Sequence, residues 1–308
     1  MVLVIDCNNL GYASAYATGD LTYEAKPTGV LFGFLSQIYK LAEYFGCGRF
    51  VFCWDSRKSY RKKAYPSYKE HRRKDLTSEE WDNLRKVYEQ FDLLRKEVLP
   101  QMGFSNVFHQ AGYEADDLIA HVVQRFPDEY IIVSTDNDLW QLIDKGRKGK
   151  TFVKVFNPRT KKLIGYKEFV ASWGIEPYKW AEIKAIAGCP SDGIEGVKGV
   201  GEATAVKYVL GTLLKGKIRE RIESSQEIIR RNRPLVTLPY AGVRPINIEK
   251  LEWPQMWTLD FMDVFGRYGF GSFLKEERFE KWAELFGLER GRKEDGERER
   301  KRLRKGTV

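Results

Sequence analysis

Cysteine is scarce in this sequence, and its four occurrences are scattered. Cys7, Cys47, Cys53 and Cys189 form no Cys-x-x-Cys pair and lie in or beside apolar runs. A disulfide framework or a structural zinc site is usually marked by patterned cysteine spacing, so the sequence indicates neither. We therefore expect reduced, buried thiols, as in a cytosolic protein.

Long apolar runs are missing as well. No stretch approaches the roughly 20 apolar residues that a membrane-spanning helix needs. The apolar start of the chain, Met1 to Ile5, is too short for a secretory signal peptide and has no basic leader. These absences predict a soluble intracellular protein, cytoplasmic in location, with no membrane partner.

Acidic residues are outnumbered by basic ones. The 308 residues, enough for one large domain or two modest ones, include 52 Lys and Arg against 43 Asp and Glu, which gives a net charge of +9. A polyanion is the natural partner of such a surface. An ordinary solvated basic surface would have the same composition, so charge alone does not decide.

Three apolar runs that have the pattern of buried strands are each followed by acids. Asp6 follows residues 2–5, Asp55 follows residues 50–54, and residues 130–134 lead to two acids, Asp136 and Asp138. With helices between them, these runs are typical of an open α/β fold, in which ligands bind at the carboxyl ends of parallel strands. One such acid is often a turn residue, but three in succession favour a site.

The intervening elements have recognisable limits. Thr28 and Gly46 bound an amphipathic helix, and a second long helix runs from Thr77 to about Leu99 and is expected to end at Pro100. Further on, the sequence predicts a hairpin of residues 152–156 and 162–165 around Asn157 and Pro158.

Acids are densest between Tyr113 and Asp138. Five carboxylates lie at the two ends of this stretch: Glu114, Asp116 and Asp117 at the start, and Asp136 and Asp138 at the end. Two like charges about 4 Å apart repel by about 4 kcal/mol at an effective dielectric of 20, so a fold that gathers them needs cations. Mg²⁺ or Mn²⁺ suits oxygen-only ligands. The alternative is that these acids only cap helices and turns.

The run from Arg57 to Lys74 has the opposite character. It carries nine basic residues, one acid and three tyrosines. Such a run does not pack into a core, and its tyrosines offer stacking surfaces beside phosphate contacts. We interpret it as a nucleic-acid contact, with a merely solvated loop as the alternative.

A glycine-rich turn follows a predicted helix near Tyr178 to Ala187. Gly196, Gly199 and Gly201 stand directly before another helix, so backbone N–H groups there suit a phosphate. It is not a Rossmann fingerprint, because no strand precedes it and the turn joins two helices.

The rest of the chain shows no chemistry. Residues 212–288 have helical spacing, for example at Phe261, Val264 and Phe265, and are predicted to pack as helices. Residues 289–308 are highly charged and are expected to be frayed helix or disordered.

Six ordered motifs together resemble the flap endonuclease and 5′-3′ exonuclease family, in the pattern of stand-alone phage enzymes and of the nuclease domain of bacterial DNA polymerase I. The resemblance covers roughly residues 1–211. Its motifs are Asp6, Trp54-Asp55-Ser56-Arg57, residues 65–72, Glu114-Ala115-Asp116-Asp117, Thr135-Asp136-Asn137-Asp138, and Ser191-Asp192 with residues 196–201.

The resemblance implies a fold and its modules. The fold is a PIN-like, mostly parallel sheet flanked by helices, with residues 1–175 as the nuclease core and residues 56–100 as a basic helical arch. Residues 176–211 would form a helix-three-turn-helix that binds duplex DNA.

The resemblance also assigns residues. The metal-site acids would be Asp6, Asp55, Glu114, Asp116, Asp117, Asp136, Asp138 and Asp192, holding two Mg²⁺ or Mn²⁺ ions, and Lys69 and Arg72 would contact the scissile phosphate. The DNA-binding residues would be Arg57, Lys58, Tyr60, Arg61, Lys62, Lys63, Tyr68, Gly196, Lys198, Gly199, Gly201 and Lys207, with K⁺ at the hairpin.

One position departs from the family pattern. The family usually has Gly-Asp-x-x-Asp before the hairpin, and Cys189 replaces the first of those acids. That acid commonly serves the second metal ion, and the sequence leaves open whether Asp192 compensates.

The predicted function is hydrolysis of DNA phosphodiesters near 5′ ends, flaps or junctions by a monomeric two-metal-ion 5′ nuclease. Two alternatives stay open from sequence: a weakly active or non-catalytic DNA-structure-binding protein on the same scaffold, and a PIN-type ribonuclease. The glycine hairpin argues against the ribonuclease, because a duplex-gripping module suits DNA junctions.

Overall fold

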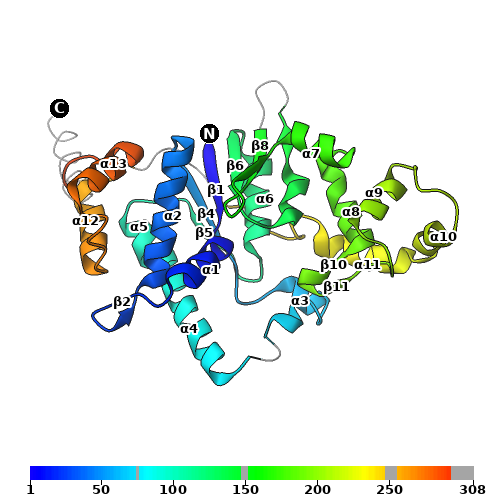
Figure 1. Cartoon of the computed structure of the whole chain (residues 1–308), viewed down its shortest axis with the longest axis horizontal. Helices are drawn as coiled ribbons and strands as arrows, with labels where there is room; N and C mark the ends of the chain where they lie inside the picture. Colours follow the sequence, from blue (N-terminus) through cyan, green and yellow to red (C-terminus); the bar gives the residue numbers. More distant parts are fainter. Residues whose placement is uncertain (74–75, 147–151, 247–254, 293–308) are drawn as a thin grey trace, which may run out of the picture.

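A mostly parallel sheet forms the centre of the computed structural model, which describes residues 1–73, 76–146, 152–246 and 255–292 (Figure 1). Within these ranges the strand order is β5-β4-β1-β6-β8-β7, with β9 paired to β8. The strands are β1 (Val2–Asp6), β4 (Phe50–Trp54), β5 (Val107–His109), β6 (Glu129–Val133), β7 (Asp144–Lys145), β8 (Phe152–Asn157) and β9 (Lys162–Ile164). Only β7 and β9 run antiparallel to their neighbour, so the predicted α/β sheet is confirmed.

The central strands are buried on both faces. Successive side chains of a strand point to opposite sides of the sheet, and a hydrophobic layer covers each side. Leu3 and Ile5 of β1 pack into one hydrophobic layer, and Val2 and Val4 into the other. Their continuous apolar sequence follows from this double burial.

The first layer is formed mainly by helices α1 (Cys7–Thr18), α2 (Gly29–Phe45), α12 (Thr258–Arg267) and α13 (Glu276–Phe286). The predicted limits of α2 are confirmed: Thr28 is its N-cap residue, and Gly46 ends it with a left-handed φ of 58°. The helical spacing predicted near Phe261 and Trp282 is also confirmed, and the two rings lie 5.8 Å apart.

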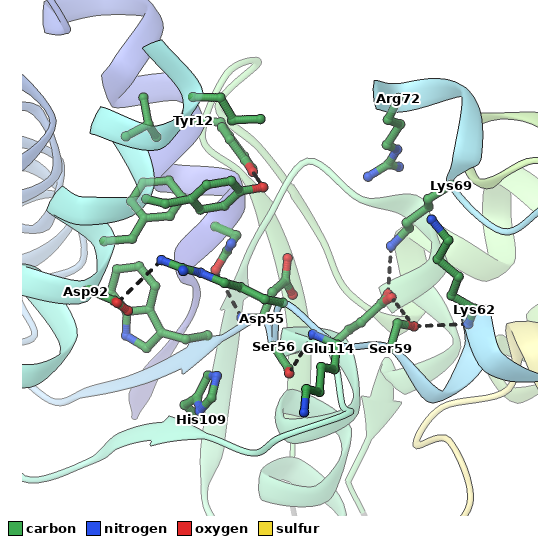
Figure 2. Close-up of a pocket in the computed structure, with 18 of the residues that line it drawn as sticks. Tyr12, Asp55, Ser56, Ser59, Lys62, Lys69, Arg72, Asp92, His109 and Glu114 are labelled. Atoms are coloured by element: carbon green, nitrogen blue, oxygen red, sulfur yellow. Dashed lines mark hydrogen bonds and ion pairs between the residues drawn. The ribbon is translucent and has the colours of Figure 1, made fainter. Parts of the chain in front are cut away.

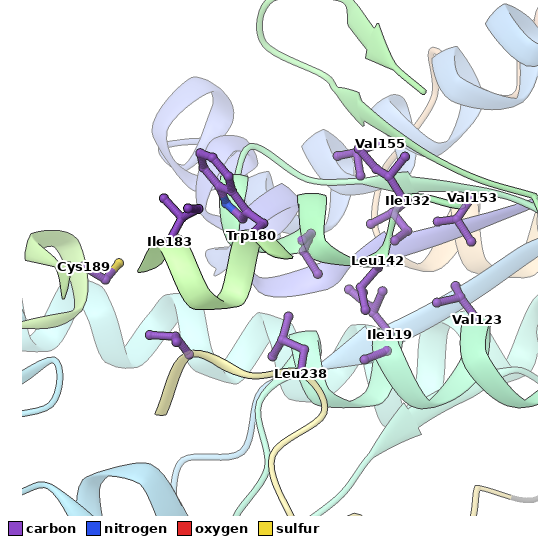
Figure 3. Packing of buried hydrophobic residues seen from close by; sticks show 14 of the residues in the cluster. Ile119, Val123, Ile132, Leu142, Val153, Val155, Trp180, Ile183, Cys189 and Leu238 are labelled. Carbon is purple, nitrogen blue, oxygen red and sulfur yellow. The ribbon is translucent and has the colours of Figure 1, made fainter. Parts of the chain in front are cut away.

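The second layer contains α6 (Ala115–Arg125), the 3₁₀ helix η3 (Asn137–Leu142), α8 (Trp180–Ala187) and α11 (Gln226–Val236). Figure 3 shows this packing: Ile119 and Val123 of α6 face Ile132 of β6, and Trp180 and Ile183 of α8 continue the cluster toward Cys189. Cys189 therefore lies where the hydrophobic core meets the edge of the sheet.

The long helix after Thr77 differs from its prediction at the C-terminal end. Thr77 caps α4 (Ser78–Leu93) through a reciprocal bond with Glu80. The helix then continues through a π-helical turn (η2, Leu94–Val98) into α5 (Leu99–Gln101) instead of ending at Pro100. Pro100 is the second residue of α5 and directly follows the π-helical turn, where the regular α-helical hydrogen-bond pattern is already interrupted.

Several short elements connect these layers. Within the described ranges, no helix is long and apolar enough to cross a bilayer. The predicted hairpin of β8 and β9 is confirmed. Of residues 289–308, only 289–292 are described, so the prediction for the tail lies outside the described residues. The remaining elements are β2 (Thr22–Tyr23), β3 (Lys26–Pro27), α3 (Tyr60–Ala64), η1 (Glu70–Arg73), α7 (Tyr166–Trp173), η4 (Pro177–Lys179), β10 (Gly188–Cys189), η5 (Pro190–Asp192), β11 (Ile194–Glu195), α9 (Glu202–Val209) and α10 (Lys217–Ser224).

Candidate active site and metal centre

Acidic side chains from four elements face one another at the carboxyl edge of the sheet. Strand β1 pairs with β4 on one side and β6 on the other, so Asp6, Asp55 and Asp136 come from adjacent strand ends. The first turn of α6 adds Asp116. The structure thus brings together four of the predicted metal ligands.

Hydrogen bonds fix the orientation of these carboxylates. Asp6 accepts a bond of 2.7 Å from the Ser134 hydroxyl and one of 3.1 Å from the backbone N–H of Asn9. Asp55 accepts a bond of 2.7 Å from the N–H of Ala115, which ties the end of β4 to the start of α6. The donors hold the oxygens in place before any cation binds.

The carboxylates raise one another's pKa. Burial, together with Asp55, raises the pKa of Asp6 to about 7. Burial and the charges of Asp136 and Asp6 raise the pKa of Asp116 well above its usual range. The pKa values of Asp55 and Asp136 are also raised, first by burial and then by neighbouring acids.

This cluster fits a divalent cation. Within the described ranges, none of the four carboxylates has an ion-pair partner within 4.0 Å. A buried group of acids that lacks a counter-charge is stabilised by a cation, and oxygen-only donors suit Mg²⁺ or Mn²⁺. The donor chemistry therefore agrees with the divalent cation predicted from sequence.

A second group of ligand-type side chains lies beside the first. Ligand atoms of Asp138, Cys189 and Asp192 are all within 4.8 Å of one another, and the three residues are buried. The Cys189 thiol donates to Asp138 Oδ2 at 3.7 Å, and Lys184 Nζ lies 3.0 Å from Asp138 Oδ1. Burial, with the charge of Asp138, raises the pKa of Cys189 to about 12.

Lys69 and Arg72 each contact an acid of the site, and Figure 2 shows Lys69 pointing toward Glu114. Lys69 Nζ lies 2.7 Å from Glu114 Oε2, and Arg72 Nη2 lies 2.7 Å from Asp192 Oδ1. Burial would raise the pKa of Glu114, but Lys69 and Arg61 outweigh it and hold that pKa below its usual value. Glu114 therefore differs from the four acids above, because it already has a cationic partner.

The family comparison agrees with this geometry. Residues 1–174, more than half of the chain, match the family model described as the 5′-3′ exonuclease, N-terminal resolvase-like domain. The chain belongs to the 5′-3′ exonuclease family. The resemblance drawn from the sequence motifs is thereby confirmed.

Curated relatives of this exonuclease-family chain are much longer proteins. It is 28% identical over 262 residues to DNA polymerase I of Mycobacterium leprae, covering 77% of the chain and 27% of the relative. It is 28% identical over 295 residues to the thermostable DNA polymerase I of Thermus thermophilus, covering 89% of the chain and 33% of the relative. The chain thus spans about a third or less of their length.

Solved structures share the fold. A T5 5′-exonuclease with bound zinc superposes with a TM-score of 0.65 at 22% identity, over 86% of this chain and 98% of that one. The bacteriophage T5 flap endonuclease in a complex with DNA and metal ions gives a TM-score of 0.63 at 21% identity, over 87% and 99%. The PIN-like fold predicted for the exonuclease-family chain is confirmed.

Two predicted site residues pair with each other instead. Asp117, expected as a metal ligand, is fully buried and accepts two bonds of 2.7 Å from Arg61. Arg61, expected on DNA, is only 3% exposed and also donates to the carbonyl of Leu235. These contacts correct two sequence predictions. The buried, paired guanidinium of Arg61 does not reach a phosphate, and Asp117 has no free oxygen for a metal ion.

The other arch residues divide by exposure. Tyr68, predicted to contact DNA, is 3% exposed, and its hydroxyl donates to Glu114 at 2.8 Å, so it supports the site from within. Tyr60 is 44% exposed and packs edge-on against Tyr113. The remaining predicted contacts are on the surface: Arg57, Lys58, Lys62 and Lys63.

The glycine turn presents its cations to solvent. Lys198, Gly199, Gly201 and Lys207 are exposed, whereas Gly196 is half-buried against the carbonyl of Ala187. Gly199 has a left-handed φ of 75°, which favours glycine there. A short antiparallel hairpin, with two residues in each of the strands β10 and β11, precedes the turn. The sequence did not predict this hairpin.

A large pocket adjoins the carboxylates. It has a volume of about 880 Å³ and is lined by residues of α1, of the segment from Asp55 to Arg72, and of α4 (Figure 2). Its wall combines aromatic rings with cations, including Tyr12, Tyr88, Arg57 and Lys62, and it reaches Asp55.

Lys184 is the site residue that the sequence interpretation missed. It is 7% exposed and lies 3.0 Å from both Asp138 and Glu202. The available signal was its position between Ile183 and Ala185 on the buried face of α8, where a lysine needs a carboxylate partner.

Proposed function

We propose that this chain is a structure-specific 5′ nuclease that hydrolyses DNA phosphodiesters near single-strand/duplex junctions. The observation that carries the proposal is the cluster of Asp6, Asp55, Asp116 and Asp136, which has raised pKa values and, among the described residues, no ion-pair partner within 4.0 Å. Family membership supports the reaction class.

The acids would hold the metal ions. Asp6, Asp55, Asp116 and Asp136 supply oxygen donors for one end of the centre, and Asp138 and Asp192 for the other. Two bound divalent ions, with Mg²⁺ or Mn²⁺ at the oxygen-only end, would supply a nucleophilic water and charge neutralisation for an in-line displacement. Ser134 and Ala115 would keep the acids oriented through the bonds described above.

Lys69 and Arg72 would act on the phosphate. Both reach the carboxylate cluster from the arch side, and both carry N–H donors that a phosphodiester oxygen accepts. A preorganised donor matters most where charge develops in the transition state. We therefore assign Lys69 to the scissile phosphate and Arg72 beside it.

The arch and the hairpin would select DNA by shape. The pocket combines stacking surfaces with cations, which suits a single strand. The exposed Lys198 and Lys207 flank the glycine turn and suit duplex phosphates, with K⁺ at the hairpin as a further proposal. Phosphate contacts carry no base sequence, so we expect structure-selective binding by a monomer.

The test is Mg²⁺-dependent cleavage of a 5′-flap DNA, beside nicked and blunt duplexes and an RNA of the same shape. Lys69→Ala should lower single-turnover cleavage by about a hundredfold or more and leave the DNA dissociation constant nearly unchanged. Lys40→Ala, an exposed lysine on α2 away from the site, is the matched control.

Asp136→Ala should abolish cleavage and leave DNA binding largely intact. Retained cleavage in that variant would overturn the metal-site assignment. Wild-type binding without cleavage at any pH would favour the non-catalytic alternative, and preference for the RNA would favour the ribonuclease.

A further inference from the structure

The two ends of the metal centre have different donor chemistry. Asp6, Asp55, Asp116 and Asp136 offer only oxygen. The other end offers two carboxylates and one sulfur, because Cys189 lies with Asp138 and Asp192 inside a single cluster whose ligand atoms are within 4.8 Å of one another.

The contacts around the second cluster orient one carboxylate oxygen of Asp138 toward Cys189. Asp138 is divided between two partners, since Oδ1 lies 3.0 Å from Lys184 and Oδ2 lies 3.7 Å from the Cys189 sulfur. Lys184 is held in turn by Glu202 at 3.0 Å. Asp138 Oδ2 therefore faces Cys189 rather than the lysine.

The Cys189 sulfur and the Asp192 carboxylate are the other two members of this cluster. The Cys189 sulfur lies 3.1 Å from the Ser191 hydroxyl, and Cys189 is 3% exposed. Asp192 is anchored by Arg72, which lies 2.7 Å from its Oδ1. Cys189 follows directly from α8 and the hydrophobic core, so its position is set by packing (Figure 3).

We propose that Asp138, Cys189 and Asp192 form a mixed sulfur and carboxylate subsite that selects a thiophilic divalent cation, Zn²⁺ or Cd²⁺, over Mg²⁺. This inference rests on the proposed function, because it places the subsite at one end of the nuclease metal centre. Thiolate is a poor donor for Mg²⁺ and a strong one for Zn²⁺, which accepts Cys and Asp ligands together.

The charges around the second cluster also favour a thiophilic ion over Mg²⁺. Lys184 lies 3.0 Å from Asp138, and Arg72 and Lys69 lie 2.7 and 3.9 Å from Asp192, so a hard ion gains little attraction from these two carboxylates. A thiophilic ion displaces the thiol proton to solvent and creates the negative charge that it binds. Selectivity thus comes from the sulfur and not from the acids.

The experiment titrates Cd²⁺ into the metal-free full chain with Mg²⁺ present in excess. We expect a thiolate-to-cadmium charge-transfer absorption band and the release of about one proton per bound ion in weakly buffered solution. Cys189→Ser should lose the band and weaken Cd²⁺ binding by at least about tenfold, since even indirect supports of a metal site are worth 10- to 100-fold. Cys189→Asp should lose the band and bind Mg²⁺ more tightly.

Cys47→Ser is the matched control, because Cys47 lies beside Met1 and away from the site, and it should keep the band. A band that survives in Cys189→Ser, or no band in the wild type, overturns the inference. Neither result depends on cleavage. A wild-type protein that cleaves with Mg²⁺ but shows no band refutes only this inference. One that shows the band but cleaves neither with Mg²⁺ alone nor with Mg²⁺ and Zn²⁺ together refutes only the proposed function.

Discussion

At the scale of single residues, the Arg61–Asp117 pair joins three segments that are distant in sequence. Asp117 accepts bonds from Arg61, from the N–H of Glu114 and from the N–H of Tyr240. Arg61 donates to Leu235 and lies under the Tyr240 ring. The pair therefore sets the start of α6, where Glu114 and Asp116 are positioned.

Breaking this pair should cost stability. Asp117→Ala leaves a buried guanidinium without its counter-charge, so we expect a loss of about 3 kcal/mol in the free energy of unfolding, measured in urea. The double variant Arg61→Leu with Asp117→Ala should lose less than the sum of the two single losses, because it removes both charges. Additive losses would show that the pair is not coupled.

The acid cluster should make stability depend on pH. Folding raises the pKa of Asp6 from 3.8 to about 7, so over that window the folded state binds more protons than the unfolded state. The sign of linkage then makes stability fall as pH rises through the window. In metal-free protein, urea midpoints should fall with pH, the slope should be smaller in Asp116→Asn, and added Mg²⁺ should raise the midpoint at neutral pH. An equal slope in Asp116→Asn would contradict the electrostatic origin.

At the scale of elements, the segment that carries Lys69 docks on the loop between β10 and β11. Lys69 has a left-handed φ of 54°, and its N–H donates to the carbonyl of Asp192 at 2.7 Å. Gly193 has a φ of 69°, and a Cβ there would lie 2.8 Å from the carbonyl of Ser67. The close approach needs glycine at position 193.

Gly193→Ala should therefore displace Lys69. We expect slower single-turnover cleavage with little change in metal affinity at Asp6, Asp55 and Asp136, because these strand-end acids are untouched. Gly266→Ala is the control: nothing lies within 4 Å of its added Cβ, and alanine within α12 should stabilise by about 0.5–1 kcal/mol. Equal effects of both substitutions would contradict the docking argument.

The sequence predicts features that depend on neighbouring residues better than contacts between distant elements. Strand-end acids were predictable, because an apolar run followed by Asp6 or Asp55 is a local pattern. Asp116 and Asp117 are adjacent acids of one helix turn, and only a partner 56 residues away in the chain, Arg61, distinguishes them. The contact between Lys184 and Asp138 also joins separate elements, so no local pattern specifies it.

At the scale of the whole molecule, α12 and α13 close the first layer of the core. Trp282 is fully buried and its ring lies 5.2 Å from Tyr39 of α2 and 5.3 Å from Phe265. The helical packing predicted for residues 212–288 thus includes direct contact with the nuclease sheet's own helix layer.

Trp282→Ala should destabilise the entire fold by about 3–5 kcal/mol in a single transition. Far-ultraviolet circular dichroism and flap cleavage, followed through urea, should report the same midpoint if α13 belongs to one cooperative unit. Met262→Ala, an exposed methionine of the neighbouring α12, should change stability by no more than about 0.5 kcal/mol. Separate midpoints would show that the C-terminal helices unfold on their own.

The separation of the site residues along the chain has a consequence during translation. Asp6 is synthesised well before Asp192, and Tyr240, whose backbone N–H contacts Asp117, is made later still. A nascent chain that has emerged only through β6 holds several acids and no complete centre. Under the proposed function, the site would be complete only after Tyr240 has been made, so a shorter nascent chain would not yet cleave nearby nucleic acid.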